Sequence, residues 1–120
     1  MPGDGVVTTL YKICEQASWR AAEQDGLYRG SEVDRRDGFI HFSTAGQLAE
    51  TAARHFASKI DLVLVAIDGG ALGPQLKWER SRGGDLFPHL YGMLPLSAVQ
   101  WARPLPDEVD GRRVIPELDP

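Results

Sequence analysis

The clearest hydrophobic signal in the chain is an unbroken apolar run between two aspartates, at residues 61–68. A run of this length with polar ends is typical of a strand buried on both faces of a sheet. Residues 8–14, which are rich in β-branched and aromatic side chains, predict another long strand. Shorter or alternating apolar patterns predict further strands at residues 27–30, 39–43, 76–80, 87–93 and 98–103.

Helical patterns lie in the first half of the chain. Thr44 and Gln47 have the spacing of a capping box, and apolar residues then recur at helical spacing, which predicts a helix to Ser58 with Phe56 on its buried face. Ser18 is placed to cap a shorter helix that Gly26 ends, whereas residues 32–37 predict a charged turn. With helices early and strands late, we expect an α+β fold with a mostly antiparallel or mixed sheet.

Length and composition fit one domain. The chain has 120 residues, of which 42% are hydrophobic and 25% charged, and neither a repeat nor a linker divides it. We therefore expect a single domain over residues 1–120, with a polar C-terminal tail from about residue 107. Cys14 is the only cysteine, so an intramolecular disulfide is impossible.

Several functional classes do not fit this sequence. The net charge is −4 and basic stretches never exceed two residues, which argues against general nucleic-acid binding. The longest apolar stretch, at residues 62–67, is far shorter than the ~20 residues that span a bilayer. The first residues also lack a signal-peptide pattern, so we expect a cytoplasmic protein without a membrane partner. The three histidines lack close metal-ligand spacing, and we expect no metal.

Two histidines have a polar or aromatic neighbour two residues further along a predicted strand. His41 and Ser43 therefore share one face and lead into the helix that follows, an arrangement that favours a ligand-binding edge. The alternative is a buried histidine bonded to backbone and a serine that helps to cap the helix. His89 and Tyr91 repeat the spacing and favour either a ligand contact or an aromatic cluster at a strand end.

Three charged residues are further candidates. Glu79 follows Trp78, and a carboxyl group beside a large apolar ring can have a raised pKa and act as an acid or base. A paired surface acid is the alternative. Lys12 and Arg29, on early strands, are candidates for phosphate binding or for a solvated strand edge.

The sequence resembles the bacterial domain of unknown function 952 family. The matching features are Leu10-Tyr11-Lys12-Ile13, Trp19, Gly30-Ser31, Asp37-Gly38-Phe39-Ile40-His41-Phe42-Ser43-Thr44, Trp78-Glu79 and Phe87-Pro88-His89-Leu90-Tyr91-Gly92. That family is similar to the ADP-ribosyltransferase fold, a split mixed sheet that holds NAD in a central cleft, and most of all to its RNA 2′-phosphotransferases. The resemblance implies that residues 11–13, 40–43 and 62–68 form successive active-site strands, with the last one starting at His89.

The resemblance also implies roles for the candidate residues. Lys12 and Arg29 would hold the phosphates of NAD or a related nucleotide, and His41 and Ser43 would bind ribose or amide groups. Tyr91 would stack on a planar ring, and His89 or Glu79 would stabilise or deprotonate the reacting group.

The sequence departs from that fold's pattern at two positions. Lys12 stands where a histidine or arginine is usual, and the last active-site strand lacks the usual glutamate. We therefore expect a nucleotide-binding cleft with weak or absent transferase chemistry. An active NAD-dependent glycosyl or ADP-ribosyl transferase and a structural domain without a ligand are the alternatives.

Overall fold

The computed structural model describes residues 8–118; segment 1–7, which carries the expectation about signal peptides, lies outside the described residues, as do residues 119–120. One three-stranded sheet consists of β1 (Thr9–Glu15), β4 (Leu62–Asp68) and β8 (Val99–Leu105). β4 lies in the middle and is antiparallel to both neighbours. The predicted central strand at residues 61–68 is thus confirmed.

A second three-stranded sheet consists of β3 (Ile40–His41), β6 (Leu86–Leu90) and β5 (Leu76–Arg80), with β6 in the middle. β2 (Leu27–Tyr28) pairs separately with β7 (Leu94–Pro95). Every strand pair among the described residues is antiparallel. The α+β class is therefore confirmed, with antiparallel rather than mixed sheets.

In the described part of the chain, three α-helices connect these strands: α1 (Gln16–Asp25), α2 (Glu32–Asp37) and α3 (Leu48–His55). Short 3-10 turns lie at Ala45–Gln47, Gly69–Ala71, Gly73–Gln75, Arg82–Gly84 and Leu96–Ala98. Within the described residues, none of the helices is long and apolar enough to cross a bilayer.

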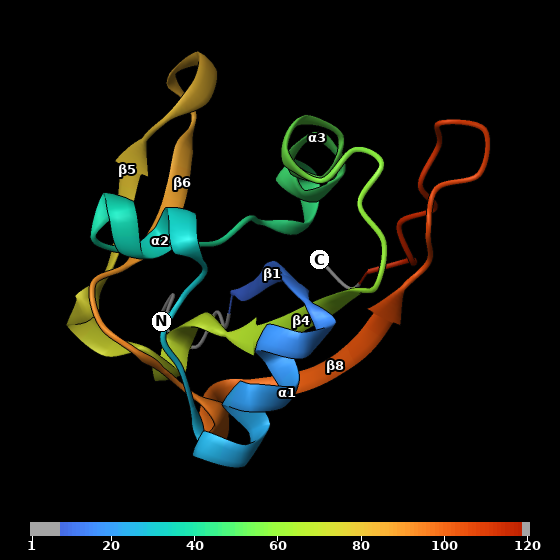
Figure 1. The fold of residues 1–120 in the computed structure, drawn as a ribbon. Coiled ribbons are helices and arrows are strands. Elements are labelled where there is room, and N and C mark those ends of the chain that lie inside the picture. The colour runs from blue at the N-terminus through green and yellow to red at the C-terminus, as the bar shows by residue number, and fades with distance from the viewer. Residues whose placement is uncertain (1–7, 119–120) are drawn as a thin grey trace.

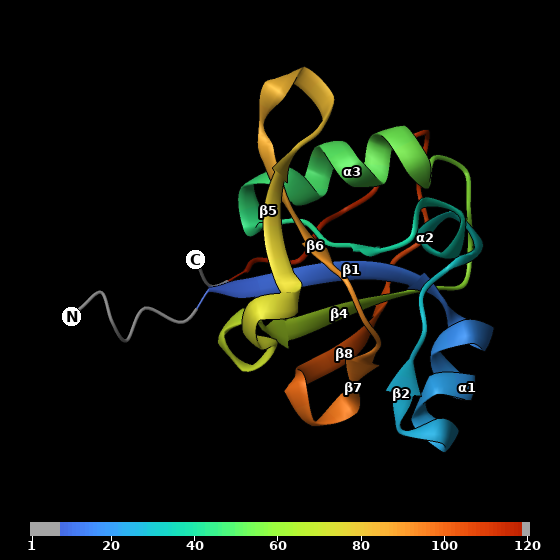
Figure 2. The same ribbon diagram turned by 90° about the vertical axis from the view of Figure 1, so that its left-hand side faces the viewer.

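The core has two layers on opposite faces of the β1–β4–β8 sheet (Figures 1 and 2). On one face, α1 contributes Trp19 and Ala22; on the other, α3 contributes Leu48 and Ala52. β4 serves both layers because its alternate side chains point to opposite faces. Its residues are buried from Leu62 to Ile67, as the apolar run predicts.

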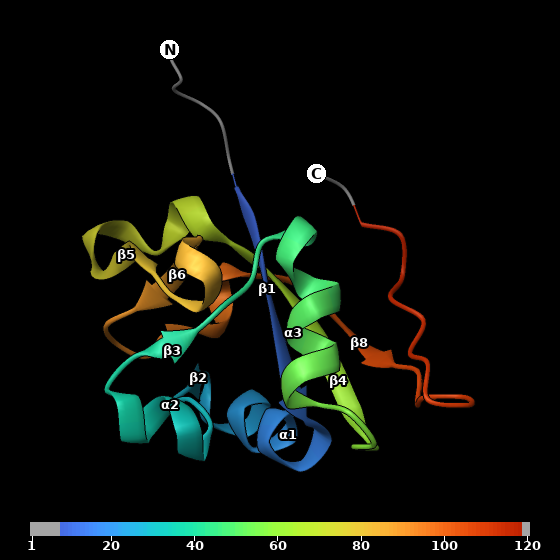
Figure 3. The ribbon, with the colours of Figure 1, turned by 90° about the horizontal axis from the view of Figure 1, so that it is seen from above.

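Within residues 8–118, one isolated bridge joins the two large sheets, which then separate. The Tyr11 N–H donates to the Ser43 carbonyl at 2.8 Å, and the Ser43 N–H donates to the Tyr11 carbonyl at 2.9 Å. From this bridge, β3 turns away towards α2 while β1 continues beside β4 (Figure 3). The edge of β1 beyond Tyr11 therefore faces a split between the sheets.

Three helix predictions need correction. Residues 32–37 form α2 rather than a turn because Ser31 caps them: its hydroxyl accepts a hydrogen bond from the Asp34 N–H. α1 begins at Gln16, so Ser18 lies inside the helix and is not its cap. α3 ends at His55, before Ser58, which has a positive φ of 65° that a helix cannot accommodate.

The C-terminal segment is tied to the end of α3. The Arg113 guanidinium donates from Nη2 to the carbonyls of Phe56 and Lys59, each at 2.9 Å. Ile115 and Leu118 pack against the core layer that contains α3. The tail predicted from about residue 107 therefore carries apolar anchors as well as its polar residues.

The buried face of α3 gives a stability prediction. Leu48 is fully buried, whereas Phe56, which the sequence pattern placed on the buried face, is only half-buried. Leu48→Ala should lower the free energy of unfolding by about 2–5 kcal/mol, and Phe56→Ala by less, because less apolar surface is lost from the core. Urea denaturation of both variants checks the order. A larger loss for Phe56→Ala would show that the helix end is packed more tightly than its exposure indicates.

Candidate functional site

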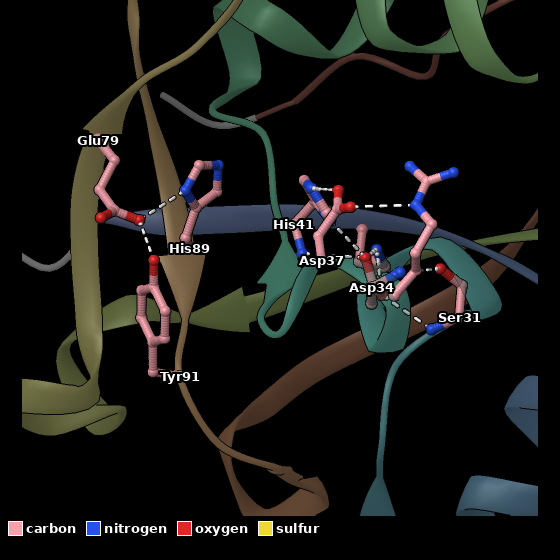
Figure 4. Close-up of polar contacts among 9 residues, drawn as sticks. Ser31, Asp34, Asp37, His41, Glu79, His89 and Tyr91 are labelled. Carbon is pink, nitrogen blue, oxygen red and sulfur yellow. Dashed lines mark hydrogen bonds and ion pairs between the residues drawn. The ribbon is translucent and has the colours of Figure 1, made fainter.

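The carboxylate of Asp34, on α2, connects the two sheets across the split. Its Oδ2 lies 2.8 Å from the Lys12 Nζ of β1, and its Oδ1 lies 2.6 Å from the His41 Nδ1 of β3. The backbone N–H of His41 also donates to Oδ1 at 3.2 Å. Side chains from three elements thus meet at one buried carboxylate (Figure 4).

The local sequence Gly30-Ser31 explains why this carboxylate can lie so deep. The Ser31 N–H donates to Asp34 Oδ2 at 2.9 Å, which completes a capping box at the start of α2. Gly30 has a φ of 99°, and a Cβ atom there would lie 2.8 Å from the Cβ of Asp34. Only glycine therefore fits beside the aspartate.

Electrostatics keep Asp34 ionised. Burial alone would raise its pKa, but the hydrogen bond from His41 and the Lys12 ammonium outweigh this effect and hold the pKa well below its usual range. The Asp34 side chain is only 2% exposed, and that of Lys12 9%. The charge of Lys12 is therefore neutralised inside the protein, and its expected role as a phosphate ligand is not supported by this geometry.

His41 uses both of its ring nitrogens within the protein. Nδ1 faces Asp34, and Nε2 lies 3.1 Å from Oδ2 of Asp37 at the end of α2. Ser43 is similarly engaged, because its hydroxyl lies 2.8 Å from the hydroxyl of Thr51 on α3. Both residues lie where the sequence places them, but their polar atoms already have partners.

A cleft of about 1290 Å³ occupies the split between the sheets. β1, α1, α2, β3 and α3 form its walls, and five of the predicted site residues line it: Lys12, Arg29, His41, Ser43 and His89. Arg29 forms a surface ion pair with Asp25. Glu79 and Tyr91, the other two predicted residues, are not among the lining residues.

Glu79 and Tyr91 are connected to the cleft by His89, which lines it and contacts Glu79. The Glu79 Oε1 atom accepts a hydrogen bond from the Tyr91 hydroxyl at 2.7 Å and lies 2.9 Å from the His89 Nδ1 (Figure 4). Glu79 and His89 can meet because β5 and β6 are paired antiparallel, with Glu79 opposite Phe87, two residues before His89. Tyr91 is therefore a partner of Glu79 and not a stacking residue of the cleft.

The pKa of Glu79 contradicts one expectation from the sequence. Hydrogen bonds from Tyr91 and then His89 lower this pKa instead of raising it, and the same contact with Glu79 raises the pKa of Tyr91. Trp78, the apolar neighbour on which the expectation rested, is 41% exposed and points to the other face of β5. Glu79 is therefore an ionised acceptor and not a proton donor.

Phe39, which the sequence analysis did not single out, packs against both histidine rings, which also contact each other edge to face with their centroids 5.3 Å apart. Its ring centroid lies 4.6 Å from that of His41, 4.1 Å from that of His89 and 5.2 Å from that of Tyr91. The sequence pattern does not indicate Asp34 either, because it predicts a charged turn at residues 32–37, where the structure has α2. The Ser31-x-x-Asp34 spacing was the available signal.

Other kinds of chemistry find little support in the described part of the chain. No group of three or more potential metal ligands comes together there. Cys14 is buried, and burial raises its pKa to about 11, which disfavours the thiolate that a nucleophile requires.

Asp34 gives a prediction that separates a buried ion pair from a surface one. Asp34→Asn should lower the free energy of unfolding by about 3–5 kcal/mol at about pH 7, because it leaves the Lys12 ammonium buried without a counter-charge. Asp37→Asn, which alters the exposed partner of the same histidine, is the matched control and should cost about 1 kcal/mol or less.

The same pair gives the pH dependence. The folded-state pKa of Asp34 lies below its ordinary value of 3.8, so its stabilising contribution is complete above that pH and is lost as the pH falls below it. Urea midpoints of the wild type and of Asp34→Asn should therefore differ by a constant amount from about pH 7 down to about pH 5, and should begin to converge only as the pH falls below 3.8. A gap that stays constant as the pH falls well below 3.8 would contradict an ionised, stabilising Asp34.

The chain has solved relatives whose structures match over most of its length. The crystal structure of protein CC0527 from Caulobacter crescentus is 47% identical, with a TM-score of 0.85 over 89% of this chain and 94% of that one. The solution structure of the same protein is 48% identical, with a TM-score of 0.77 over 86% and 89% of the two chains. A search of curated proteins found no match. The model of a protein family of unknown function, DUF952, matches residues 13–102. The chain therefore belongs to the DUF952 family.

Proposed function

We propose that the cleft binds a nucleotide of the NAD or ADP-ribose class and that any transferase chemistry there is weak. The observation that carries the proposal is a cleft of about 1290 Å³ that Arg29 and His89 line, next to Lys12, His41 and Ser43, whose polar groups are paired within the protein. Ligand pockets commonly measure about 300–1,000 Å³, so this space is ample for a dinucleotide. The antiparallel sheets split beside β1, an arrangement consistent with an ADP-ribosyltransferase-like fold.

The phosphates are assigned to arginines at the rim of the cleft. Arg35, on α2, lines the cleft and has no ion pair among the described residues. Arg29 can exchange its exposed partner Asp25 for a phosphate at little cost, because an exposed ion pair contributes little stability. Lys12 is excluded from this role by its buried pair with Asp34.

The backbone of β1 supplies a second set of contacts. The N–H and C=O groups of Tyr11 form hydrogen bonds with the backbone of Ser43. Because backbone groups point to alternate edges of a strand from one residue to the next, those of Ile13 point to the same edge as those of Tyr11, into the split. Ile13 lines the cleft, and no described backbone group pairs with it on that side. This open edge offers a donor and an acceptor to the ribose or to an amide of the ligand.

We expect slow glycosyl transfer because the charged groups near the cleft are already paired with other protein groups. Rapid glycosyl transfer needs a positioned acid–base group, worth typically ~10²–10⁴-fold in rate, and charges aimed at the reacting centre. Here the Lys12 charge is neutralised by Asp34, and Glu79 accepts a hydrogen bond from Tyr91 outside the cleft. We therefore expect binding without rapid turnover.

Calorimetric titration with ADP-ribose tests the binding proposal. We expect a dissociation constant between about 10 μM and 1 mM, and a two- to tenfold weakening, roughly, in both Arg29→Ala and Arg35→Ala. Arg54→Ala is the matched control, because Arg54 pairs with Glu50 four residues away, as Arg29 does with Asp25, but lies outside the cleft. Its affinity should equal that of the wild type. Absence of binding, or equal weakening by all three variants, would contradict the proposal.

An assay of nicotinamide release from NAD tests the expectation of weak chemistry. Release should be very slow even when the ligand saturates the protein. Rapid release that Glu79→Gln abolishes would identify an active transferase instead and would overturn the assignment of Glu79 as a mere acceptor.

A further inference from the structure

His89 is a buried histidine that belongs to both the sheet and the cleft. It lies on β6, the middle strand of its sheet, and its side chain is only 6% exposed. Its ring stacks near Phe39, and Phe87, two residues earlier on the same face of β6, also lines the cleft. The His41 ring also lies edge to face against it, with the two ring centroids 5.3 Å apart. Because the His89 side chain is so deeply buried, a ring nitrogen without a hydrogen-bond partner is costly there.

The first ring nitrogen of His89 is fixed by Glu79. A carboxylate can only accept hydrogen bonds, so the Nδ1 atom, 2.9 Å from Glu79 Oε1, must carry the proton that joins them. The lowered pKa of Glu79 is consistent with an ionised carboxylate at this position. The tautomer of the neutral ring is thereby determined by its neighbour.

The second ring nitrogen, Nε2, is left as an acceptor. It has no hydrogen-bond partner among the described residues, and it is not one of the enclosed unpaired nitrogens, which are Trp19 Nε1 and Arg113 Nε. It therefore keeps some exposed surface, on the side of the ring away from Glu79 (Figure 4). His89 is one of the residues that line the cleft.

We propose that the Glu79–His89 pair presents an unprotonated nitrogen to the cleft and thereby selects a ligand ring that carries an N–H donor. This inference rests on the proposed nucleotide function and specifies it further. His41 cannot take this role, because Asp34 and Asp37 occupy both of its nitrogens. Suitable donors are the carboxamide of a nicotinamide ring and the amino group of adenine. A carboxylate or an unsubstituted ring position in their place would leave Nε2 without a partner.

Two analogues of NAD test this selection by calorimetry at about pH 8, above the ordinary pKa of histidine. One analogue has a carboxylate in place of the carboxamide, and the other has hydrogen in place of the adenine amino group. We expect one of the two to bind about tenfold or more weakly than NAD, because a site built around a hydrogen bond rejects ligands that lack the donor.

Glu79→Gln is the decisive variant. A glutamine can either donate to or accept from Nδ1, so the His89 ring of this variant is free to carry its proton on Nε2. The ratio of the affinity for NAD to the affinity for the weaker analogue should therefore fall to less than about threefold. Glu50→Gln, the same substitution at an exposed glutamate of α3, is the control and should keep the wild-type ratio. Thermal unfolding of both variants confirms that they are folded.

The possible outcomes separate the two proposals. The role of His89 would be overturned if NAD and both analogues bound with equal affinity, or if Glu79→Gln left the ratio of their affinities unchanged. Binding of ADP-ribose would still support the nucleotide function in that case. Failure of ADP-ribose and NAD to bind would overturn both.

Discussion

The site depends on the contacts that the ionised carboxylate of Asp34 makes with Lys12 and His41. Asp34 lies on a six-residue helix, yet its partners come from different sheets: Lys12 from the sheet centred on β4 and His41 from the sheet centred on β6. Among the described residues, backbone hydrogen bonds join these sheets only at the Tyr11–Ser43 bridge. Beyond that bridge, the side chains around Asp34 determine how far the split opens. Removal of one partner from such a buried pair is costly, because the other charge then remains in the interior without compensation.

This arrangement explains why a small domain can keep an open cleft. The edge of β1 is not covered by another strand beyond Tyr11, and an uncovered strand edge must find other protection. Here α1 and α3 flank it on opposite faces, while α2 is held across the gap by the Lys12–Asp34 pair. Gly30 and the Ser31 cap allow the short helix to approach so closely. The residues that look like binding groups in the sequence therefore include several that maintain the shape of the cleft.

Much of the fold could be predicted from the sequence because its strands carry strong local signals. The apolar run of β4, the β-branched residues of β1 and the histidine-containing segments of β3 and β6 all form strands. The helix α2 was missed, because its stability comes from a cap and from tertiary ion pairs and not from a pattern of apolar residues. The cleft residues were found by their type and spacing. Their roles could not be predicted. The partner of Lys12 is Asp34 on α2, a helix that the sequence pattern does not indicate, and the partner of His89 is Glu79, which the β5–β6 register brings close.

Comparison of the two histidines shows why residue type alone does not determine function. His41 and His89 are paired directly across β3 and β6, and each has its Nδ1 atom beside a carboxylate. His41 has a second carboxylate, Asp37, at its other nitrogen, so its hydrogen-bonding capacity is used within the protein. His89 has the Phe39 and His41 rings beside it, and its remaining nitrogen has no hydrogen-bond partner among the described residues. The same side chain is thus part of the framework on one strand and, in our proposal, a ligand contact on the next, and the difference lies in one aspartate at the end of α2.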